Sequence, residues 1–125
     1  MMNSRVFILE RPRRALDISP AEVYGELVEL FNTQRYEKRP SMFNTHEYGE
    51  EIIRRLTEAG YDPNRDYYCV VGSMVAMVVA IATLVSRYKT VRVLLYNSVS
   101  NEYIERLIGE SDGADNTQNT VMDVA

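Results

Sequence analysis

The sequence predicts a small three-layer α/β domain of the Rossmann-like class, with a mostly parallel sheet of three to four strands in the order β-α-α-β-α-β-α. Tyr67–Val71 and Thr90–Tyr96 are largely apolar, strand-like runs, and an apolar helical segment, Met74–Val85, lies between them. Apolar strands separated by a buried helix are typical of a parallel pair joined by a right-handed crossover. We expect one α/β domain over residues 1–109 and an acidic polar tail over residues 110–125.

Composition and charge narrow the class of protein. With 46% hydrophobic and 26% charged residues, the chain of 125 residues falls among globular and not disordered proteins. The tail holds four of the 18 acidic residues and none of the 14 basic ones, so residues 1–109 carry no net charge. Nucleic-acid-binding proteins normally carry a basic excess, which argues against general nucleic-acid binding. Cys69 is the only cysteine, so an intrachain disulfide is impossible.

A first strand is predicted over Arg5–Glu10, whose centre is apolar and whose ends are charged. The segment Ser19-Pro20-Ala21-Glu22 then matches a capping box with proline at the first helical position. Behind it, four apolar residues recur at helical spacing: Val23, Leu27, Leu30 and Phe31. They predict a first helix over residues 20–33.

Two further helices are predicted. One begins at Asn44 or Thr45 and ends before Gly60, a residue suited to the left-handed conformation of a helix cap. The other follows the second apolar strand, where Ser100 can cap a last helix that ends near Ile108.

A membrane span is the alternative for the central apolar run. Tyr67–Val85 contains 19 residues without a charge, which approaches the length of a spanning helix. The Gly72-Ser73 pair interrupts this run where a strand would turn into a helix, and a second apolar strand follows closely. A soluble strand–helix–strand unit explains both features. The early apolar run Val6–Leu9 is too short for the core of a signal peptide, so we expect no membrane association and a cytoplasmic location.

The candidate binding site lies where the strands end. In an open parallel sheet, ligands bind beyond the carboxyl ends of the strands, and a glycine there lets the backbone approach a ligand closely. The helix that follows offers free N–H groups and the positive end of its dipole, which suit a phosphate or a carboxylate. The predicted site residues are Gly72, Ser73, Arg11, Arg13, Arg14, Asn97 and Ser98.

A purely structural explanation is favoured for the same residues. Gly72-Ser73 is also the pattern of a tight turn with a helix cap, and the arginines can be solvated charges that pair with Asp17 or with the tail. The chain has one glycine where a dinucleotide fingerprint needs three, and it lacks a G-x-x-x-x-G-K-[ST] motif.

No complete catalytic or metal-binding set is recognisable. Ser73 lacks the second glycine of a nucleophile elbow, and His46 is the only histidine. Cys69 lies in mid-strand without a cationic neighbour in sequence, which favours a buried, inert thiol. Glu50 and Asp62 lie on a solvated helix face and in a turn, so we expect no metal. The sequence therefore favours a non-enzymatic protein without a cofactor.

Five stretches carry a resemblance to a known group of proteins: F-I-L-E-R-P, Y-G-E-L-V-E-L-F, R-P-S-M-F-N-T, D-Y-Y-C-V-V-G-S and V-R-V-L-L-Y-N. Over about residues 5–108 the chain resembles small uncharacterised tailed-phage accessory proteins of the α/β, Rossmann-like kind. These share a strand, an R-P-S-x-[FW]-x-T connection and a D-Y-x-x-x-x-G strand before an apolar helix. The resemblance implies a phage product that acts in the cytoplasm of the host cell, and it brings no function with it.

Three functions are compatible with these features. The first is an interaction protein that self-associates, binds a host or virion protein, or does both. Open sheet edges are commonly covered by a partner, so we expect a homo-oligomer. The alternative is a module that binds a nucleotide or another phosphate ligand at the Gly-Ser turn. The third, nucleic-acid binding through Arg35, Tyr36, Lys38 and Arg39, is disfavoured by the neutral charge of residues 1–109.

Overall fold

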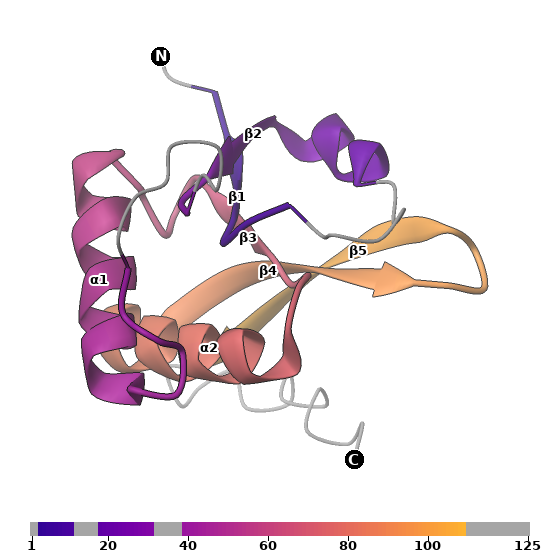
Figure 1. Cartoon of the computed structure of the whole chain (residues 1–125). Helices are drawn as coiled ribbons and strands as arrows, with labels where there is room; N and C mark the ends of the chain where they lie inside the picture. Colours follow the sequence, from indigo (N-terminus) through magenta and orange to yellow (C-terminus); the bar gives the residue numbers. More distant parts are fainter. Residues whose placement is uncertain (1–2, 12–17, 32–38, 110–125) are drawn as a thin grey trace.

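Five strands form one mixed sheet among residues 3–11, 18–31 and 39–109, the part of the chain that the computed structural model describes (Figure 1). The strand order is β2-β1-β3-β4-β5. The strands are β1 (Arg5–Ile8), β2 (Glu26–Glu29), β3 (Tyr67–Cys69), β4 (Thr90–Asn97) and β5 (Glu102–Gly109). β1 to β4 are mutually parallel, and β5 runs antiparallel to β4. The helices in these ranges are the 3-10 helix η1 (Ser19–Tyr24) and the α-helices α1 (Thr45–Glu58) and α2 (Met74–Tyr88).

The predicted α/β fold with a mostly parallel sheet is confirmed. β3, α2 and β4 occupy the three segments predicted for the strand–helix–strand unit, and β3 pairs in parallel with β4. Gly60 follows α1 with a φ of 79°, the left-handed conformation expected of a helix cap. The sheet is larger than the predicted three to four strands, and the order β-α-α-β-α-β-α is wrong. The Rossmann-like class is not confirmed, because both α-helices pack on one face and the last strand is antiparallel.

The predicted helix over residues 20–33 is wrong. Its first turn forms the short η1, with Ile18 and not Ser19 in the cap position, and β2 follows. Gly25 separates the two elements: its φ is 153°, and a Cβ built on it would lie 2.3 Å from the Ser4 carbonyl oxygen. The chain turns at this glycine and runs beside β1. The backbone of β1 then supplies the hydrogen bonds that a helix would have made internally.

The predicted last helix from Ser100 to Ile108 is also wrong. β5 occupies this segment and pairs along its whole length with β4. Asparagines close the turn between the strands: the Asn97 side-chain oxygen accepts a hydrogen bond from the Val99 N–H at 2.9 Å, and Asn101 has a φ of 61°. Asparagine tolerates this left-handed conformation, so the turn favours a hairpin once β4 is available as a partner.

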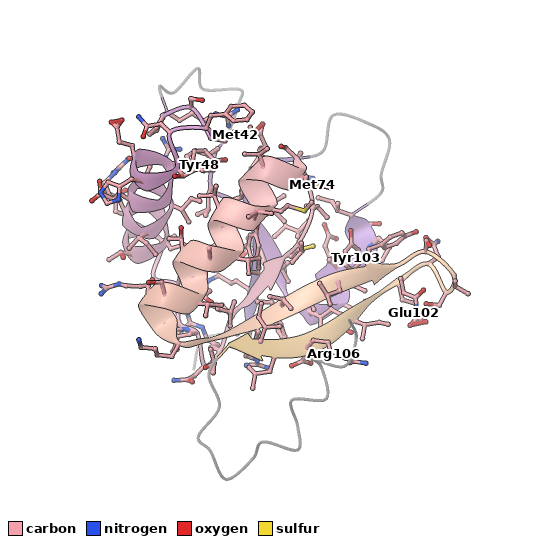
Figure 2. The ribbon with its side chains drawn as sticks, turned by 90° about the horizontal axis from the view of Figure 1, so that it is seen from below. Met42, Tyr48, Met74, Glu102, Tyr103 and Arg106 are labelled. Carbon is pink, nitrogen blue, oxygen red and sulfur yellow. The ribbon has the colours of Figure 1, made fainter. Side chains whose placement is uncertain are left out.

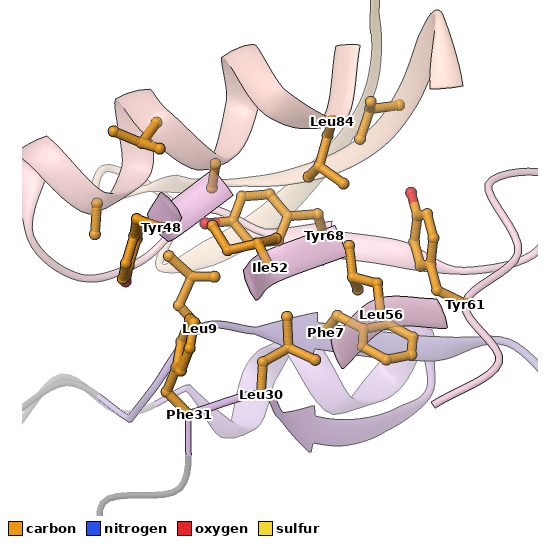
Figure 3. Packing of buried hydrophobic residues seen from close by; sticks show 14 of the residues in the cluster. Phe7, Leu9, Leu30, Phe31, Tyr48, Ile52, Leu56, Tyr61, Tyr68 and Leu84 are labelled. Atoms are coloured by element: carbon orange, nitrogen blue, oxygen red, sulfur yellow. The ribbon is translucent and has the colours of Figure 1, made fainter. Parts of the chain in front are cut away.

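The two faces of the sheet are covered unequally. α1 and α2 pack on one face over a large apolar cluster that includes Phe7 and Tyr68 (Figure 3). In the described ranges, η1 is the helix that covers the opposite face. The apolar run of α2 predicted a helix buried on every side, but Met74 is 74% exposed and Val78 is 63% exposed. No helix in the described ranges has both the length and the apolar character needed to cross a membrane.

One buried carboxylate joins the starts of β1 and β3 to the end of α1. The Asp66 side chain, just before β3, has no exposed surface. It accepts hydrogen bonds from the backbone N–H groups of Arg5 at 3.0 Å and Asp62 at 2.8 Å, and two from the Arg65 guanidinium, each at 2.9 Å. The guanidinium groups of Arg5 and Arg65 also donate to the carbonyl of Gly60, which lies directly after α1. The three elements are therefore held together at a single point.

Asp66→Asn should lower the free energy of unfolding by about 2 to 4 kcal/mol at neutral pH, because the buried donors lose their charged acceptor. Burial acts to raise the pKa of the Asp66 carboxyl, but the hydrogen bonds from Arg65, Asp62 and Arg5 outweigh burial and hold this pKa below its ordinary value. The ionised carboxylate therefore stabilises the fold above the pKa of the unfolded chain. This contribution is lost as the pH falls through the lower pKa of the folded state.

Urea unfolding of both proteins at neutral pH and at about pH 2 measures this effect, and the difference between wild type and variant should narrow in acid. Glu58→Gln, at an exposed carboxylate near the end of α1, is the control and should change the stability by less than about 0.5 kcal/mol. An Asp66→Asn variant as stable as the wild type at neutral pH would refute the role given to this carboxylate.

Candidate functional site

The candidate site lies at the carboxyl edge of the sheet, between β1 and β3. In the strand order β2-β1-β3-β4-β5, the chain leaves β1 toward β2 at one edge of the sheet, whereas it leaves β3 toward β4 in the opposite direction. Open α/β sheets bind their ligands beyond the strand ends at such a change of direction. α2 begins at this edge, and the segment before α1 also reaches it, because the Ser73 hydroxyl donates to the Met42 sulfur at 3.4 Å.

Gly72 and Ser73 form the turn from β3 into α2. Gly72 has a φ of 116°, which favours glycine, and a Cβ built on it would meet no atom within 4 Å. Ser73 takes the cap position of α2, but its side chain makes no capping hydrogen bond. The first N–H groups of a helix have no partner within the helix, so the turn leaves both space and donors at the strand end. Ligand binding at this turn stays a prediction.

Arg11 is held on the side of β2 and not on the side of β3. Its backbone N–H donates to the Glu29 carboxylate at 3.2 Å, and its Nε lies 3.6 Å from the same group. The neighbouring Glu10 pairs with Arg39 at 2.8 Å. The contact between Arg11 and Glu29 is an ion pair of the kind that the structural explanation expected. Several predicted residues lie outside the described ranges: Arg13, Arg14, Asp17, Arg35, Tyr36, Lys38 and the tail.

Asn97 and Ser98 lie at the turn of the β4–β5 hairpin, which projects from the sheet in Figure 1. β4 pairs with β3 only as far as Leu94, so Asn97 lies three residues, or roughly 10 Å along the strand, beyond the last pair. None of the described contacts joins this turn or Arg11 to the Gly72-Ser73 pair. The described structure therefore assembles only the Gly-Ser part of the predicted site.

In the part of the chain that the structure describes, reactive side chains are not gathered in one place. Within the described residues, no group of three or more His, Cys, Asp or Glu side chains could hold a metal ion. His46 is exposed on α1 and lies 3.4 Å from Glu50. Cys69 is buried on the opposite face of the sheet, and burial raises the pKa of its thiol to about 12. Neither arrangement supplies the paired nucleophile and base that covalent catalysis requires.

A groove between α1 and α2 is the feature that sequence reasoning missed. It opens to solvent and has a volume of about 930 Å³. Its lining combines apolar and charged side chains, among them Ile53, Val78, Ala82, His46, Arg54 and Arg87. The helices approach closely here, because a Cβ on Gly49 would lie 2.7 Å from Thr83 Oγ1. The sequence did contain a signal for this groove, namely the unbroken apolar run of α2. A helix that packs against the protein with only one side leaves the apolar side chains on its other sides exposed.

The region that matches a known family includes the whole sheet. Residues 4–109 match the family described as phage Pam3 gp32-like protein. No curated protein and no solved structure matches the chain. The match agrees with the resemblance to phage proteins that the sequence motifs carry.

Native Cys69 should not react with an aromatic disulfide reagent at about pH 8, because the thiol is buried and a pKa of about 12 keeps it protonated. The absorbance of the released thiolate should stay at baseline in buffer and report one thiol per chain in urea. Val99→Cys is the positive control, because the Val99 side chain is 95% exposed in the hairpin turn. Fast reaction of the native wild type would show that Cys69 is accessible after all.

Proposed function

Because the chain belongs to the phage Pam3 gp32-like family, we propose that it is a non-enzymatic phage protein that acts by binding proteins. It self-associates, binds a host or virion protein, or does both. The observation that carries the proposal is the apolar surface along the groove between α1 and α2.

The outer face of α2 presents large apolar side chains to solvent. Met74 and Val78 lie one helical turn apart, and both are mostly exposed. Val78 lines the groove together with Ile53 of α1, and the charged side chains of Arg54 and Arg87 line it as well. Exposed apolar surface bordered by polar residues is typical of protein interaction sites. A groove of this kind suits the apolar face of an amphipathic helix supplied by a partner.

The separation of the reactive residues supports binding over catalysis. His46 lies on the helical face of the sheet and is exposed, whereas Cys69 is buried on the face that η1 covers. The residue types that most often serve as base and nucleophile therefore do not meet in the described part of the chain. A protein-binding function needs no such pair.

Val78→Asp should weaken partner binding about tenfold or more, because a charge in an apolar contact costs at least about 1.4 kcal/mol. Immobilised wild type and variant are incubated with solubilised virion proteins and with host lysate, and the captured proteins are quantified by mass spectrometry. The Val78 side chain is largely exposed, so the variant should keep the thermal unfolding curve of the wild type.

Val23→Asp is the matched control, since Val23 is also exposed but belongs to η1, on the other face of the sheet. It should capture the same proteins as the wild type. Equal capture by all three proteins would exclude the groove as the binding surface. A wild type that captures nothing above bare matrix and is monomeric in light scattering would overturn the proposed function.

A second candidate function is the binding of a nucleotide or another phosphate ligand at the Gly72-Ser73 turn. The observation that favours it is the open space at Gly72, together with the missing side-chain cap at Ser73. Backbone N–H groups at the start of a helix attract anions when a strand end leaves room for them.

Under this alternative, nucleotides or inorganic phosphate should raise the melting temperature of the wild type by mass action. Ser73→Asp supplies a carboxylate that caps α2 and repels an anion, so it should abolish the shift without destabilising the free protein. Ser98→Asp places the same charge in the hairpin turn and should leave the shift intact. A flat response of the wild type across the panel would rule the alternative out.

A further inference from the structure

We propose that the acidic tail, residues 110–125, occupies the groove between α1 and α2 of its own copy of the chain when no partner is bound. These residues lie outside the described ranges, but the structure describes both the groove and the strand from which the tail continues. The inference rests on the proposed function, because it names the segment with which a protein partner would compete for the groove.

The tail continues from the end of β5, beside the end of α2. Gly109, the last residue of β5, lies opposite Thr90 in the ladder with β4. It packs so closely against the Lys89 carbonyl that a side chain has no room there. Lys89 takes the cap position after α2, and Arg87, two residues earlier, lines the groove. The tail therefore begins next to one end of the groove.

The groove changes in character from this end to the other. α1 and α2 run in the same direction, because each connects two parallel strands. Arg54 and Arg87 line the groove toward the ends of the two helices, whereas Val78 lines it nearer to the start of α2. Met74, one turn before Val78, extends the apolar surface to the point where Met42 reaches α2 (Figure 2). The groove is therefore basic near the attachment of the tail and apolar farther away.

The tail has the complementary order of residues. Its acidic residues come first and its apolar residues come later: Glu110, Asp112 and Asp115, and then Val121, Met122 and Val124. Laid along the groove from its point of attachment, the tail brings carboxylates to the arginine end and apolar side chains to the apolar end. Opposite charges then attract each other, and apolar surface is removed from water on both sides of the contact.

Arg87 is the groove side chain for which the tail supplies a partner. Among the described residues no carboxylate pairs with Arg87, and its guanidinium carbon lies 6.0 Å from the centre of the Tyr88 ring. Arg54, by contrast, already pairs with Glu51 and Glu58 of its own helix. Charged pairs at the rim of an apolar contact select the partner and its orientation. Arg87 therefore favours an occupant that carries a carboxylate at this end.

The tail is long enough to reach the apolar end. Val78 and Arg87 are nine residues apart on α2, which corresponds to about 14 Å along the helix. Val121 is twelve residues beyond Gly109, a stretch that spans roughly 18 Å as a helix and up to about 40 Å as an extended chain. In either conformation the apolar residues of the tail can lie beside Val78.

A segment of the same copy has an advantage over any occupant that arrives from solution. A short connection keeps the tail near the groove at an effective concentration on the order of 1 mM. A contact with a dissociation constant in that range would fill about half of the grooves, whereas the tail of a second copy at a much lower concentration would fill few of them. A protein partner must displace the tail, which lowers its apparent affinity in proportion to the fraction of open grooves.

Chemical cross-linking in the full chain tests the contact. Val78→Cys is combined with Met122→Cys, and a bifunctional maleimide bridges the two thiols where they lie close together. Val23→Cys with Met122→Cys is the matched control, because Val23 is also exposed but lies on the face that η1 covers. Cys69 stays in place because it is buried.

The comparison of the two pairs is informative because an unbound tail would reach both positions. The extended tail spans up to about 40 Å, more than the roughly 35 Å width of a domain of this size. With the tail held in the groove, the Val78 pair should react at least about tenfold faster than the Val23 pair. Electrophoresis should show the cross-linked product as a monomer.

Charge reversal tests the orientation of the tail. In the Val78–Met122 pair, Arg87→Glu should lower the cross-linking rate about threefold or more, because it turns an attraction into a repulsion. Arg106→Glu makes the same change on β5, close to the attachment of the tail but outside the groove lining, and should leave the rate unchanged (Figure 2). Asp112→Arg with Asp115→Arg should restore the rate in the Arg87→Glu variant. Thermal unfolding checks that all variants fold.

The outcomes separate this contact from the proposed function. A faster reaction of the Val78 pair, with loss in Arg87→Glu and rescue by reversal of the tail charges, supports the tail as occupant. Equal rates for both pairs, or a cross-linked dimer in place of the monomer, overturn it and leave the partner-capture assay unaffected. If the tail cross-links to the groove but the wild type captures no protein, the tail contact stands and the proposed function fails.

Discussion

The buried carboxylate of Asp66 is the constraint on which the arrangement of the sheet depends. A carboxylate without exposed surface is tolerated only where hydrogen bonds replace its water. Here the donors come from the start of β1, through Arg5, and from the loop after α1, through Asp62 and Arg65. Because β1 and β3 both begin beside this carboxylate, they pair with each other from their first residues onward. Their carboxyl ends therefore meet at the opposite edge, where the Gly72-Ser73 turn lies.

The same anchor explains why both α-helices share one face. α1 must end beside Asp66, and Arg55 near its end is buried and donates to the Leu30 carbonyl at 2.8 Å, which ties the helix to the end of β2. α2 leaves β3 on this face and meets α1 at Gly49, where the missing side chain allows close contact. α2 thus has the sheet beneath it and α1 on one flank, and the rest of its apolar surface, including Val78, faces solvent.

Elements with strong local signals could be predicted from the sequence, and those decided by distant contacts could not. The unit from β3 to β4 and the cap at Gly60 follow from residues adjacent in the chain. The apolar residues of the segment after Gly25 recur at helical spacing, yet this segment forms a strand. The reason is that Gly25 packs closely against the Ser4 carbonyl, which brings the segment beside β1, and β1 offers it a complete set of hydrogen bonds. Ser100 is a plausible helix cap, yet β4 offers the segment after it a complete ladder. The Gly72-Ser73 turn was found from its pattern, whereas the pairing of Arg11 with Glu29 required the position of β2.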